Sequence, residues 1–464
     1  MKNILKKFKD YINKGIQILK ENSFDKKLVY LFILIMGISF FALIISILVD
    51  AEKVLSDISY FYFRSPGADF EFVYEVVQQP SPYTVPGNNS VYPPLSLLIM
   101  KGIVAIFPFR SAYPIFHFGV MVFSFALLYK TMKQKKWIKI LLLTFIAFSL
   151  PFMFAYERGN IVTWFFLCTV LFLYLYRGKG GNTSTDKVKR EFAYFFLAMA
   201  AAMKIYPIIF IVLLIRNKDF KGMVKTLGYS LILFFAPFLF FEGGLNNIGY
   251  FFDNMSNFTK LVLMTYRNNS FASLFNQFIR ITGNQYSRFE AFYFSGIAFW
   301  LSIAFGFLTG ASVLFIKEKH KLLAVLCALS ILIPTISSEY NLMFMAPALV
   351  AFLNAKQKNK REIVILICYS AIFLAMPLGY FWNDPDRWFD NILINSTLQI
   401  LAMIIIVVFY AVEGYINMVK MVKQKVFLKT AINQITFKPD AIDMDYSNGI
   451  FDQQEYQEVK NENG

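Results

Sequence analysis

One carboxylate stands out because of the residues around it. Asp69 lies on the loop that follows the first apolar segment, directly before Phe70, and a Tyr-Pro-Pro sequence beginning at Tyr92 closes that loop. A carboxylate partly shielded from water can accept a proton from a hydroxyl group, as a general base does. Asp69 is therefore our candidate base, and a solvated loop acid is the competing interpretation. Glu71 and Glu75 on the same loop are the alternative carboxylates.

Two basic residues are surrounded by apolar sequence. Lys204 follows the small-residue run 198–203, and Arg158 follows Glu157 near the end of another apolar run. Charges at membrane depth are costly and usually mark a binding site or a water-filled cavity. Both side chains are candidates to hold a phosphate group. The alternatives are snorkelling to the membrane surface for Lys204 and a structural ion pair with Glu157 for Arg158.

Further polar residues at the ends of apolar segments are candidates to orient a sugar or an acceptor. They are Tyr92, Asn160, Asn268, Ser270, Glu339 and Tyr340. Amide and hydroxyl groups can both donate and accept hydrogen bonds, as sugar hydroxyls require. Tyr92 also has a purely structural interpretation, since the prolines after it fix where a helix begins. Glu339 is a helix-start acid favoured by the helix dipole, a second acid of the site, or a metal ligand.

The sequence contains no pattern typical of a metal centre or a nucleotide site. The two histidines, His117 and His320, belong to no cluster with zinc spacing, and we expect neither to lie near the candidate site. There is no glycine-rich phosphate loop. We therefore expect no cofactor and no metal site, although Glu71 and Glu339 leave a divalent metal open. The three cysteines lie in apolar segments and are expected to be core residues.

The elements that must position these residues are apolar segments. Of 464 residues, 57% are hydrophobic, more than a soluble core absorbs, and the runs are continuous rather than alternating. We predict an all-α polytopic membrane protein with about twelve transmembrane helices. The predicted spans are 28–49, 111–131, 138–153, 160–176, 192–203, 205–216, 223–241, 291–316, 321–336, 341–353, 362–380 and 391–412.

Three details of this arrangement concern the candidate site. The segment 94–108 is too short for a confident span and is expected to be re-entrant or interfacial. The segments 192–203 and 205–216 are expected to form a pair of half-length helices broken at Lys204 to Pro207. The first outer loop is expected to carry short juxtamembrane helices.

The net charge of +16 reflects topology rather than nucleic-acid binding. Lysine and arginine cluster between apolar segments, as cytoplasmic loops do, whereas the loop 50–92 has six acids and two basic residues. This pattern places both termini in the cytoplasm and the candidate site outside. We predict a basic amphipathic cytoplasmic segment at 1–27, a transmembrane domain at 28–412, and a partly disordered cytoplasmic tail at 413–464.

Taken together, these residues resemble the GT-C superfamily of membrane glycosyltransferases. The resemblance is to glycosyltransferase family 87, the polyprenyl-phosphate-mannose-dependent mannosyltransferase type, over roughly 68–353. It rests on Asp69-Phe70 with Tyr74, Tyr92-Pro93-Pro94, Arg158-Gly159-Asn160, Lys204 with Pro207, Asn268 with Ser270, and Ser338 to Tyr340. It implies a GT-C-like fold, Asp69 as the base, and a lipid-phosphate donor whose phosphate meets Lys204 and Arg158. Family members often carry a motif with Trp and His where this chain has Glu339-Tyr340, so the sugar and the acceptor stay open.

The expected reaction is transfer of a hexose, mannose by analogy, from a polyprenyl-phosphate sugar to a hydroxyl of a glycolipid or glycan. Asp69 would take the proton in a single inverting displacement, on the outer side of the cytoplasmic (inner) membrane of the cell envelope. A transporter or flippase for a lipid-linked or polar solute is the alternative, but it needs access from both sides. A lipid-carrier ligase or phosphoethanolamine-type transferase would need outer-loop His, Thr or metal clusters, which we do not find.

Overall fold

A computed structural model gives the fold of the chain. It describes residues 23–49, 67–84, 90–107, 109–176, 183–262, 268–274, 277, 288–356, 359–375, 380–382 and 392–423. Most of the predicted N-terminal segment 1–27, and most of the predicted tail 413–464, lies outside these ranges. The last described helix continues to Lys423, past the predicted domain boundary at 412. The division into three parts otherwise stays a prediction.

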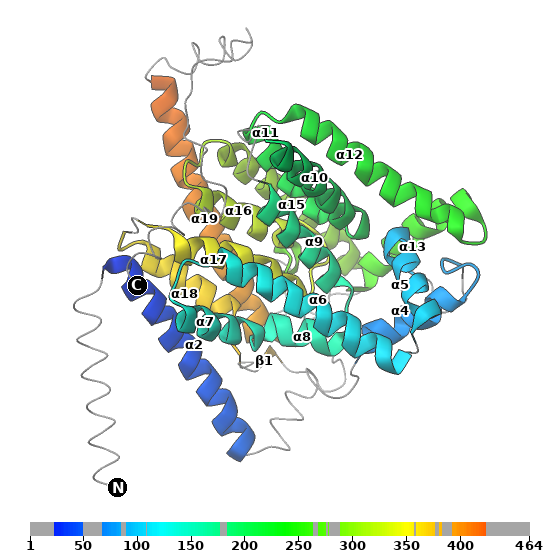
Figure 1. The fold of residues 1–464 in the computed structure, drawn as a ribbon, viewed down its shortest axis with the longest axis horizontal. Coiled ribbons are helices and arrows are strands. Elements are labelled where there is room, and N and C mark those ends of the chain that lie inside the picture. The colour runs from blue at the N-terminus through cyan, green and yellow to red at the C-terminus, as the bar shows by residue number, and fades with distance from the viewer. Residues whose placement is uncertain are drawn as a thin grey trace.

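Regular structure in the described ranges is almost entirely helical (Figure 1). The α-helices are α2 (Phe24–Val49), α4 (Ala68–Gln78), α5 (Pro94–Ile106), α6 (Phe109–Thr131), α7 (Lys136–Ala147), α8 (Leu150–Arg158), α9 (Val162–Leu175), α10 (Ser184–Met203), α11 (Ile211–Arg216), α12 (Phe220–Phe235), α13 (Asn247–Val262), α15 (Arg288–Val313), α16 (Lys319–Leu332), α17 (Met345–Asn354), α18 (Glu362–Ile372) and α19 (Ile394–Lys423). Short 3-10 helices are η1 (Tyr206–Phe210), η2 (Ala236–Phe240), η3 (Gly244–Asn246) and η4 (Glu339–Phe344). The strands β1 (Tyr380–Trp382) and β2 (Ile392–Leu393) form one small antiparallel pair.

Four helices in the described ranges are long and apolar enough to cross a membrane. They cover Phe24–Val49, Phe220–Phe240, Gly296–Val313 and Ile394–Met421, and a fifth span results if α7 and α8, bent by 57°, count as one. The other apolar helices have only 10–17 residues, whereas about 20 are needed to cross the hydrocarbon core straight. The all-helical prediction is thus supported, but the count of about twelve spans is not confirmed.

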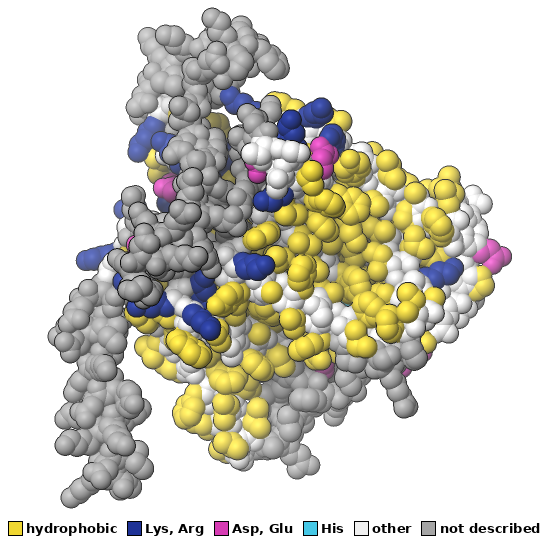
Figure 2. Space-filling model, viewed as in Figure 1, with side chains coloured by type: hydrophobic (Ala, Val, Ile, Leu, Met, Phe, Trp, Pro, Cys, Tyr) yellow, Lys and Arg dark blue, Asp and Glu magenta, His cyan; other side chains and the backbone are white. Residues whose placement is uncertain are grey.

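The surface of these helices is apolar where a soluble protein would be polar. Leu239, Phe240 and Phe307 are each more than 60% exposed. Figure 2 shows hydrophobic side chains over most of one face, with Lys and Arg side chains mainly toward its edges. An exposed apolar surface of this extent marks contact with lipid. The chain is a membrane protein.

The elements around the candidate site agree with expectation in part. The first outer loop was expected to carry short helices, and Asp69 lies in the first turn of an 11-residue helix there, α4, so its position is fixed by a helix. The segment 192–203 is the end of a full-length helix, α10, which has 20 residues. Only the second member of the expected half-length pair, Tyr206–Arg216, is short. The predicted short segment 94–108 is α5, which has 13 residues.

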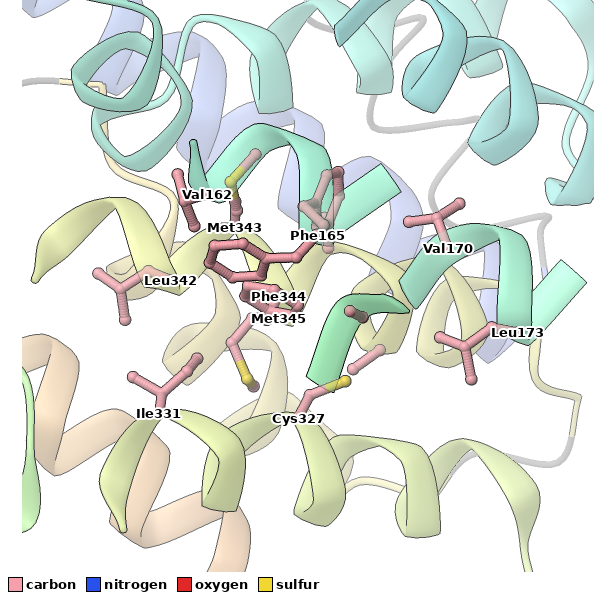
Figure 3. Packing of buried hydrophobic residues seen from close by; sticks show 14 of the residues in the cluster. Val162, Phe165, Val170, Leu173, Cys327, Ile331, Leu342, Met343, Phe344 and Met345 are labelled. Carbon is pink, nitrogen blue, oxygen red and sulfur yellow. The ribbon is translucent and has the colours of Figure 1, made fainter. Parts of the chain in front are cut away.

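The core beneath the site is formed by α9, α10, α16 and the η4–α17 segment. Val162 and Phe165 of α9 face Leu342 to Met345 in Figure 3, and the rings of Phe165 and Phe344 stack at 5.5 Å. The alanines of the run 198–203 are buried because small side chains allow α10 to approach α9 and α12 closely. Lys204 directly follows this packed segment and is thereby held in place.

Candidate active site

The first turn of α4 meets the last turn of α8. Gly67, which precedes α4 with φ of +79°, donates its backbone N–H to the carbonyl oxygen of Glu157 at 2.6 Å. Gly159 ends α8 in the left-handed conformation, with φ of +63°. Such a conformation favours glycine. The two helix ends therefore bring Asp69 and Arg158 together although they are far apart in the sequence.

Space at this junction is tightly filled. A Cβ added at Gly159 would lie 2.6 Å from the ring of Tyr113 and 2.9 Å from Cβ of Phe70. The Tyr113 hydroxyl donates to the carbonyl oxygens of Tyr156 and Glu157. Tyr113 thus packs against the end of α8, and the ring of Phe70 packs against that of Tyr113 with 5.7 Å between the ring centres. Tyr113 could not be recognised from the sequence, because it is an aromatic residue within an apolar helix.

Asp69 is held at both carboxylate oxygens. Arg158 donates from Nε to Oδ1 at 3.0 Å and forms a second hydrogen bond from Nη2 to the same oxygen. Asn160 donates from Nδ2 to Oδ2 at 2.6 Å. The partner of Arg158 is therefore Asp69, which neither sequence interpretation named. Glu71 and Glu75 are exposed on α4, so Asp69 is the carboxylate of this helix that reaches Arg158.

Asn160 uses its whole side chain in this network. It is 1% exposed, its Oδ1 accepts the backbone N–H of Val162 at 3.0 Å, and its Nδ2 also lies 3.3 Å from the Tyr92 hydroxyl. The predicted contact of Asn160 with a sugar or acceptor stays a prediction. Its contacts within the protein orient Asp69 and Tyr92.

Tyr92 lies just before α5 and is half-buried. Its carbonyl oxygen accepts the hydroxyl of Tyr83 at 3.1 Å. Burial raises the pKa of Tyr92 well above its usual range, and the negative charge of Asp69 raises it further. The phenol therefore stays protonated and can donate a hydrogen bond. The start of α5 is tied to the end of α10 by a hydrogen bond from the Ser96 hydroxyl to the carbonyl oxygen of Met203 at 3.2 Å.

Lys204 is half-buried among three aromatic rings. Its Nζ lies 5.9 Å from the ring centre of Phe165, 5.8 Å from that of Tyr206 and 6.0 Å from that of Tyr340. Aromatic faces attract cations at such distances, and the negative charge of Asp69 also attracts Lys204. Within the described ranges Lys204 takes part in no ion pair. It is thus a cation near Asp69 that retains its capacity to bind an anion.

Glu339 and Tyr340 are neighbours in sequence but belong to different surroundings. Tyr340 stacks on Phe154 at 5.7 Å, and its hydroxyl lies within electrostatic reach of Asp69 and Arg158. Glu339 is fully buried and accepts the hydroxyl of Ser396, on α19, at 3.1 Å. The structure thus brings Tyr340 to the Asp69 site and turns Glu339 toward α19.

Asn268 and Ser270 hold a loop against the segment that precedes η4. Asn268 donates from Nδ2 to the carbonyl oxygen of Thr335 at 2.8 Å, and its Oδ1 accepts the backbone N–H of Ser337 at 2.9 Å. The Ser270 hydroxyl also donates to Thr335, at 3.0 Å. These side chains are occupied by structural contacts, and their predicted role in binding a sugar or acceptor stays a prediction.

The expectation that neither histidine lies near the site is wrong for His117. Its ring packs on Phe70 at 5.4 Å, and its Nδ1 lies 3.1 Å from the Thr163 hydroxyl. His117 is 1% exposed. Through its contacts with Phe70 and Thr163 it supports the chain near Asp69 and Asn160. In the part of the chain that the structure describes, no three His, Cys, Asp or Glu side chains are grouped to hold a metal ion.

Comparison with known proteins gives one match. The family model of glycosyltransferase family 87 matches residues 91–337, more than half of the chain. No curated protein and no solved structure matches. The matched range contains Tyr92, Arg158, Asn160, Lys204, Asn268 and Ser270, whereas Asp69, Glu339 and Tyr340 lie just outside it. With its exposed apolar helices and a family match of this extent, the chain belongs to glycosyltransferase family 87 and is a membrane glycosyltransferase.

Proposed function

We propose that the protein transfers a hexose from a polyprenyl-phosphate sugar to a hydroxyl group of a glycolipid or glycan acceptor. Mannose is the sugar suggested by analogy with the family. The observation that carries the proposal is the grouping of one carboxylate, Asp69, with two cations, Arg158 and Lys204. We place the reaction on the outer side of the cytoplasmic membrane, with both termini inside, because basic residues cluster in the opposite loops.

The two cations suit a lipid-phosphate donor. Arg158 has 36% of its side chain exposed even while it contacts Asp69, and Lys204 has no ion-pair partner in the described ranges. Fixed positive groups stabilise a phosphate as it leaves with the electron pair of the breaking bond. Lys204 and Arg158 would therefore lower the barrier to cleavage between the anomeric carbon and the phosphate oxygen. No nucleotide is required on this account.

Asp69 has the geometry of a base whose orientation is fixed. Oδ1 is occupied by Arg158, whereas Oδ2 has one described donor, Asn160, and each carboxylate oxygen has two lone pairs. The acceptor hydroxyl would give its proton to Oδ2 while its oxygen attacks the anomeric carbon. The new glycosidic bond forms on the face opposite the leaving phosphate, so the configuration at that carbon inverts.

The remaining predicted residues take roles according to their place in the structure. Tyr92 and Tyr340 lie beside Asp69 and have hydroxyls that can bind the sugar or the acceptor. Asn160 acts on the reaction through Asp69 and is a positioning residue. Glu339, Asn268 and Ser270 lie in the neighbouring polar region, where contact with the acceptor or sugar would be more remote from the reacting atoms.

The test is sugar transfer in proteoliposomes from a panel of polyprenyl-phosphate sugars. Wild type is compared with Asp69→Asn and with Glu71→Gln, a matched control on the exposed side of the same helix turn. We expect wild type and Glu71→Gln to form a glycosylated product and folded Asp69→Asn to form almost none. Absence of product from wild type with every donor would refute the donor class. Product from Asp69→Asn at the wild-type rate would refute the base.

A further inference from the structure

The ammonium group of Lys204 lies among aromatic rings and forms no ion pair within the described ranges. Its neighbours are the rings of Phe165, Tyr206 and Tyr340, and the Tyr206 ring centre lies 5.8 Å from Nζ. The lysine side chain is a flexible four-carbon chain that ends in a point charge. The placement of the three rings therefore restricts where the ammonium group can lie.

Two of the three rings are held by stacking on a neighbour. The ring of Phe165 stacks on that of Phe344 with 5.5 Å between the centres, and the ring of Tyr340 stacks on that of Phe154 at 5.7 Å. Tyr206 instead meets Phe165 and Phe344 edge to face, at 5.6 Å and 5.8 Å. The Tyr206 ring is also held at its far end, by a hydrogen bond that its hydroxyl group donates.

Asn341, on η4, is the partner of the Tyr206 hydroxyl. Its Oδ1 accepts that hydroxyl at 2.6 Å, and its Nδ2 donates to the hydroxyl oxygen of Ser337 at 3.3 Å. Its backbone N–H donates to the carbonyl oxygen of Ser338 at 2.8 Å, and the residue is 1% exposed. Because both polar groups of the amide are used, the amide has a fixed orientation and directs the Tyr206 ring through its hydroxyl.

The segment that orients Asn341 is itself held by a second part of the chain. Oδ1 of Asn268 accepts the backbone N–H of Ser337 at 2.9 Å, and the carbonyl oxygen of Ser337 accepts the backbone N–H of Asn269 at 2.6 Å. Ser337 is 0% exposed. Hydrogen bonds among described residues therefore connect Asn268, through Ser337 and Asn341, to the ring of Tyr206 beside Lys204.

An apolar pair of side chains would fill the space between Tyr206 and Asn341 at lower cost. Burying a hydroxyl and an amide removes their bonds to water, and the bond between them returns only a modest net stability. What a hydrogen bond adds is direction, because it weakens steeply away from its preferred angle, whereas apolar contact is non-directional. A hydroxyl–amide pair beside Lys204 therefore serves to hold the Tyr206 ring in one orientation.

We propose that Asn341 is a positioning residue for Lys204. By holding the Tyr206 hydroxyl, it keeps the Tyr206 ring beside the Lys204 ammonium group, so that the charge is oriented before the donor phosphate binds. Tyr340, directly before Asn341 on η4, contacts Lys204 itself, so two consecutive residues of η4 place the cation. This inference rests on the proposed binding of the donor phosphate by Lys204.

The first measurement is kcat/KM for the donor in proteoliposomes. Tyr206→Phe keeps the ring and removes only the hydroxyl, whereas Asn341→Leu removes its acceptor. The control is Tyr194→Phe on α10, because the Tyr194 hydroxyl also donates to a buried side chain, that of Asp219. We expect kcat/KM to fall about tenfold in Tyr206→Phe and at least as far in Asn341→Leu, since a displaced charge binds the phosphate less well. A wild-type value in folded Tyr206→Phe, or an equal loss in Tyr194→Phe, would overturn the proposal.

The second measurement distinguishes positioning of Lys204 from a general loss of packing. Tyr206→Phe is combined with Lys204→Met in a double-mutant cycle. If the hydroxyl acts through the ammonium group, its removal has no further effect once that group is absent. The double variant should then have the kcat/KM of Lys204→Met alone. A further loss of about tenfold in the double variant, as independent effects would give, would overturn the proposal.

A third measurement separates this inference from the proposed reaction. A polyprenyl monophosphate, which carries no sugar, is titrated against each protein, and its apparent Kd is taken from the rise in melting temperature. We expect binding to be about tenfold weaker in Tyr206→Phe than in wild type or Tyr194→Phe. If wild type transfers no sugar but shows this difference, the proposed reaction fails and the inference stands. Equal affinity in wild type and Tyr206→Phe, or no binding by wild type, would overturn the inference.

Discussion

Arg158 binds Asp69 through two nitrogens on a single carboxylate oxygen. Nε lies 3.0 Å from Oδ1, and Nη2 contacts the same atom. The other oxygen is left to Asn160 and to a substrate. Because arginine fixes one edge of the carboxylate and asparagine the other, the plane of the Asp69 side chain is set before any acceptor arrives.

The first prediction concerns Asn160→Asp. This change keeps the size of the side chain and its acceptor for Val162, but it replaces the donor to Asp69 with a second carboxylate oxygen. Two carboxylates at that distance repel each other. We expect kcat to fall roughly 100-fold with little change in the KM for donor, because a small misplacement of a reacting group has an effect of this size. Steady-state kinetics in proteoliposomes measures both, and Asn417→Asp controls for the substitution itself. An unchanged kcat would contradict the positioning role.

The second prediction concerns Lys204. Replacing it with methionine removes the cation but retains most of the length of the side chain between Phe165, Tyr206 and Tyr340. We expect kcat/KM for the donor to fall about 100-fold, because the donor phosphate loses a charged partner on binding and as the leaving group. Lys204→Arg, which keeps the charge, should lose less of kcat/KM. Both variants should remain folded in a melting experiment. A kcat/KM for the donor that stays at the wild-type value in Lys204→Met would place the phosphate elsewhere.

The third prediction concerns the junction of α4 and α8. Gly159→Ala introduces a side chain at a positive φ and within 2.6 Å of Tyr113. The strain and the overlap together should lower the free energy of unfolding by roughly 2–4 kcal/mol. Gly119→Ala on α6 is the matched control, since nothing lies within 4 Å of its added Cβ. It should be neutral or stabilising by about 0.5–1 kcal/mol. Equal melting temperatures for the two variants would contradict the tight packing described here.

The sequence was sufficient to find the charged residues of the site but not their pairing. Asp69, Arg158 and Lys204 are conspicuous because charges are rare and costly in apolar sequence. Their partners depend on how helix ends dock, and no local pattern records that Gly67 and Glu157 are hydrogen-bonded. The sequence likewise could not show that Asn268 holds its loop through hydrogen bonds to Thr335 and Ser337.

The fold was predictable in type and less so in detail. Hydropathy indicates apolar helices, but it does not reveal where a helix breaks inside an apolar run. The 57° bend between α7 and α8 lies just before Pro151. Proline disfavours a helical conformation in the residue that precedes it, so the helix is interrupted there. His117 and Tyr113 were missed for a different reason. Aromatic and histidine side chains on an apolar helix look alike in sequence whether they fill a core or support a site.

The fourth prediction concerns an ion-pair cluster outside the proposed site. Lys321, near the start of α16, lies 2.8 Å from Glu413 of α19, 3.4 Å from Glu318 and 4.0 Å from Glu362 of α18. Lys321→Met should reduce the free energy of unfolding by about 3 kcal/mol, because Glu362 is buried and loses this cation. Adding Glu362→Gln should restore part of it. Lys225→Met, which breaks an exposed pair with Glu191, is the control and should change stability by at most about 1 kcal/mol.

Acid should weaken the same cluster. Burial alone would raise the pKa of Glu318, but the charge of Lys321 and the hydrogen bonds that Glu318 receives together outweigh burial, and the pKa is lowered. A carboxylate whose pKa is lower in the folded protein stabilises the fold above its unfolded pKa, and this contribution is lost as pH falls through the folded pKa. The melting temperature should therefore fall with acid more steeply in wild type than in Glu318→Gln. Identical acid dependence in both proteins would show that Glu318 adds nothing, and Lys321 would then be paired effectively with Glu413 and Glu362.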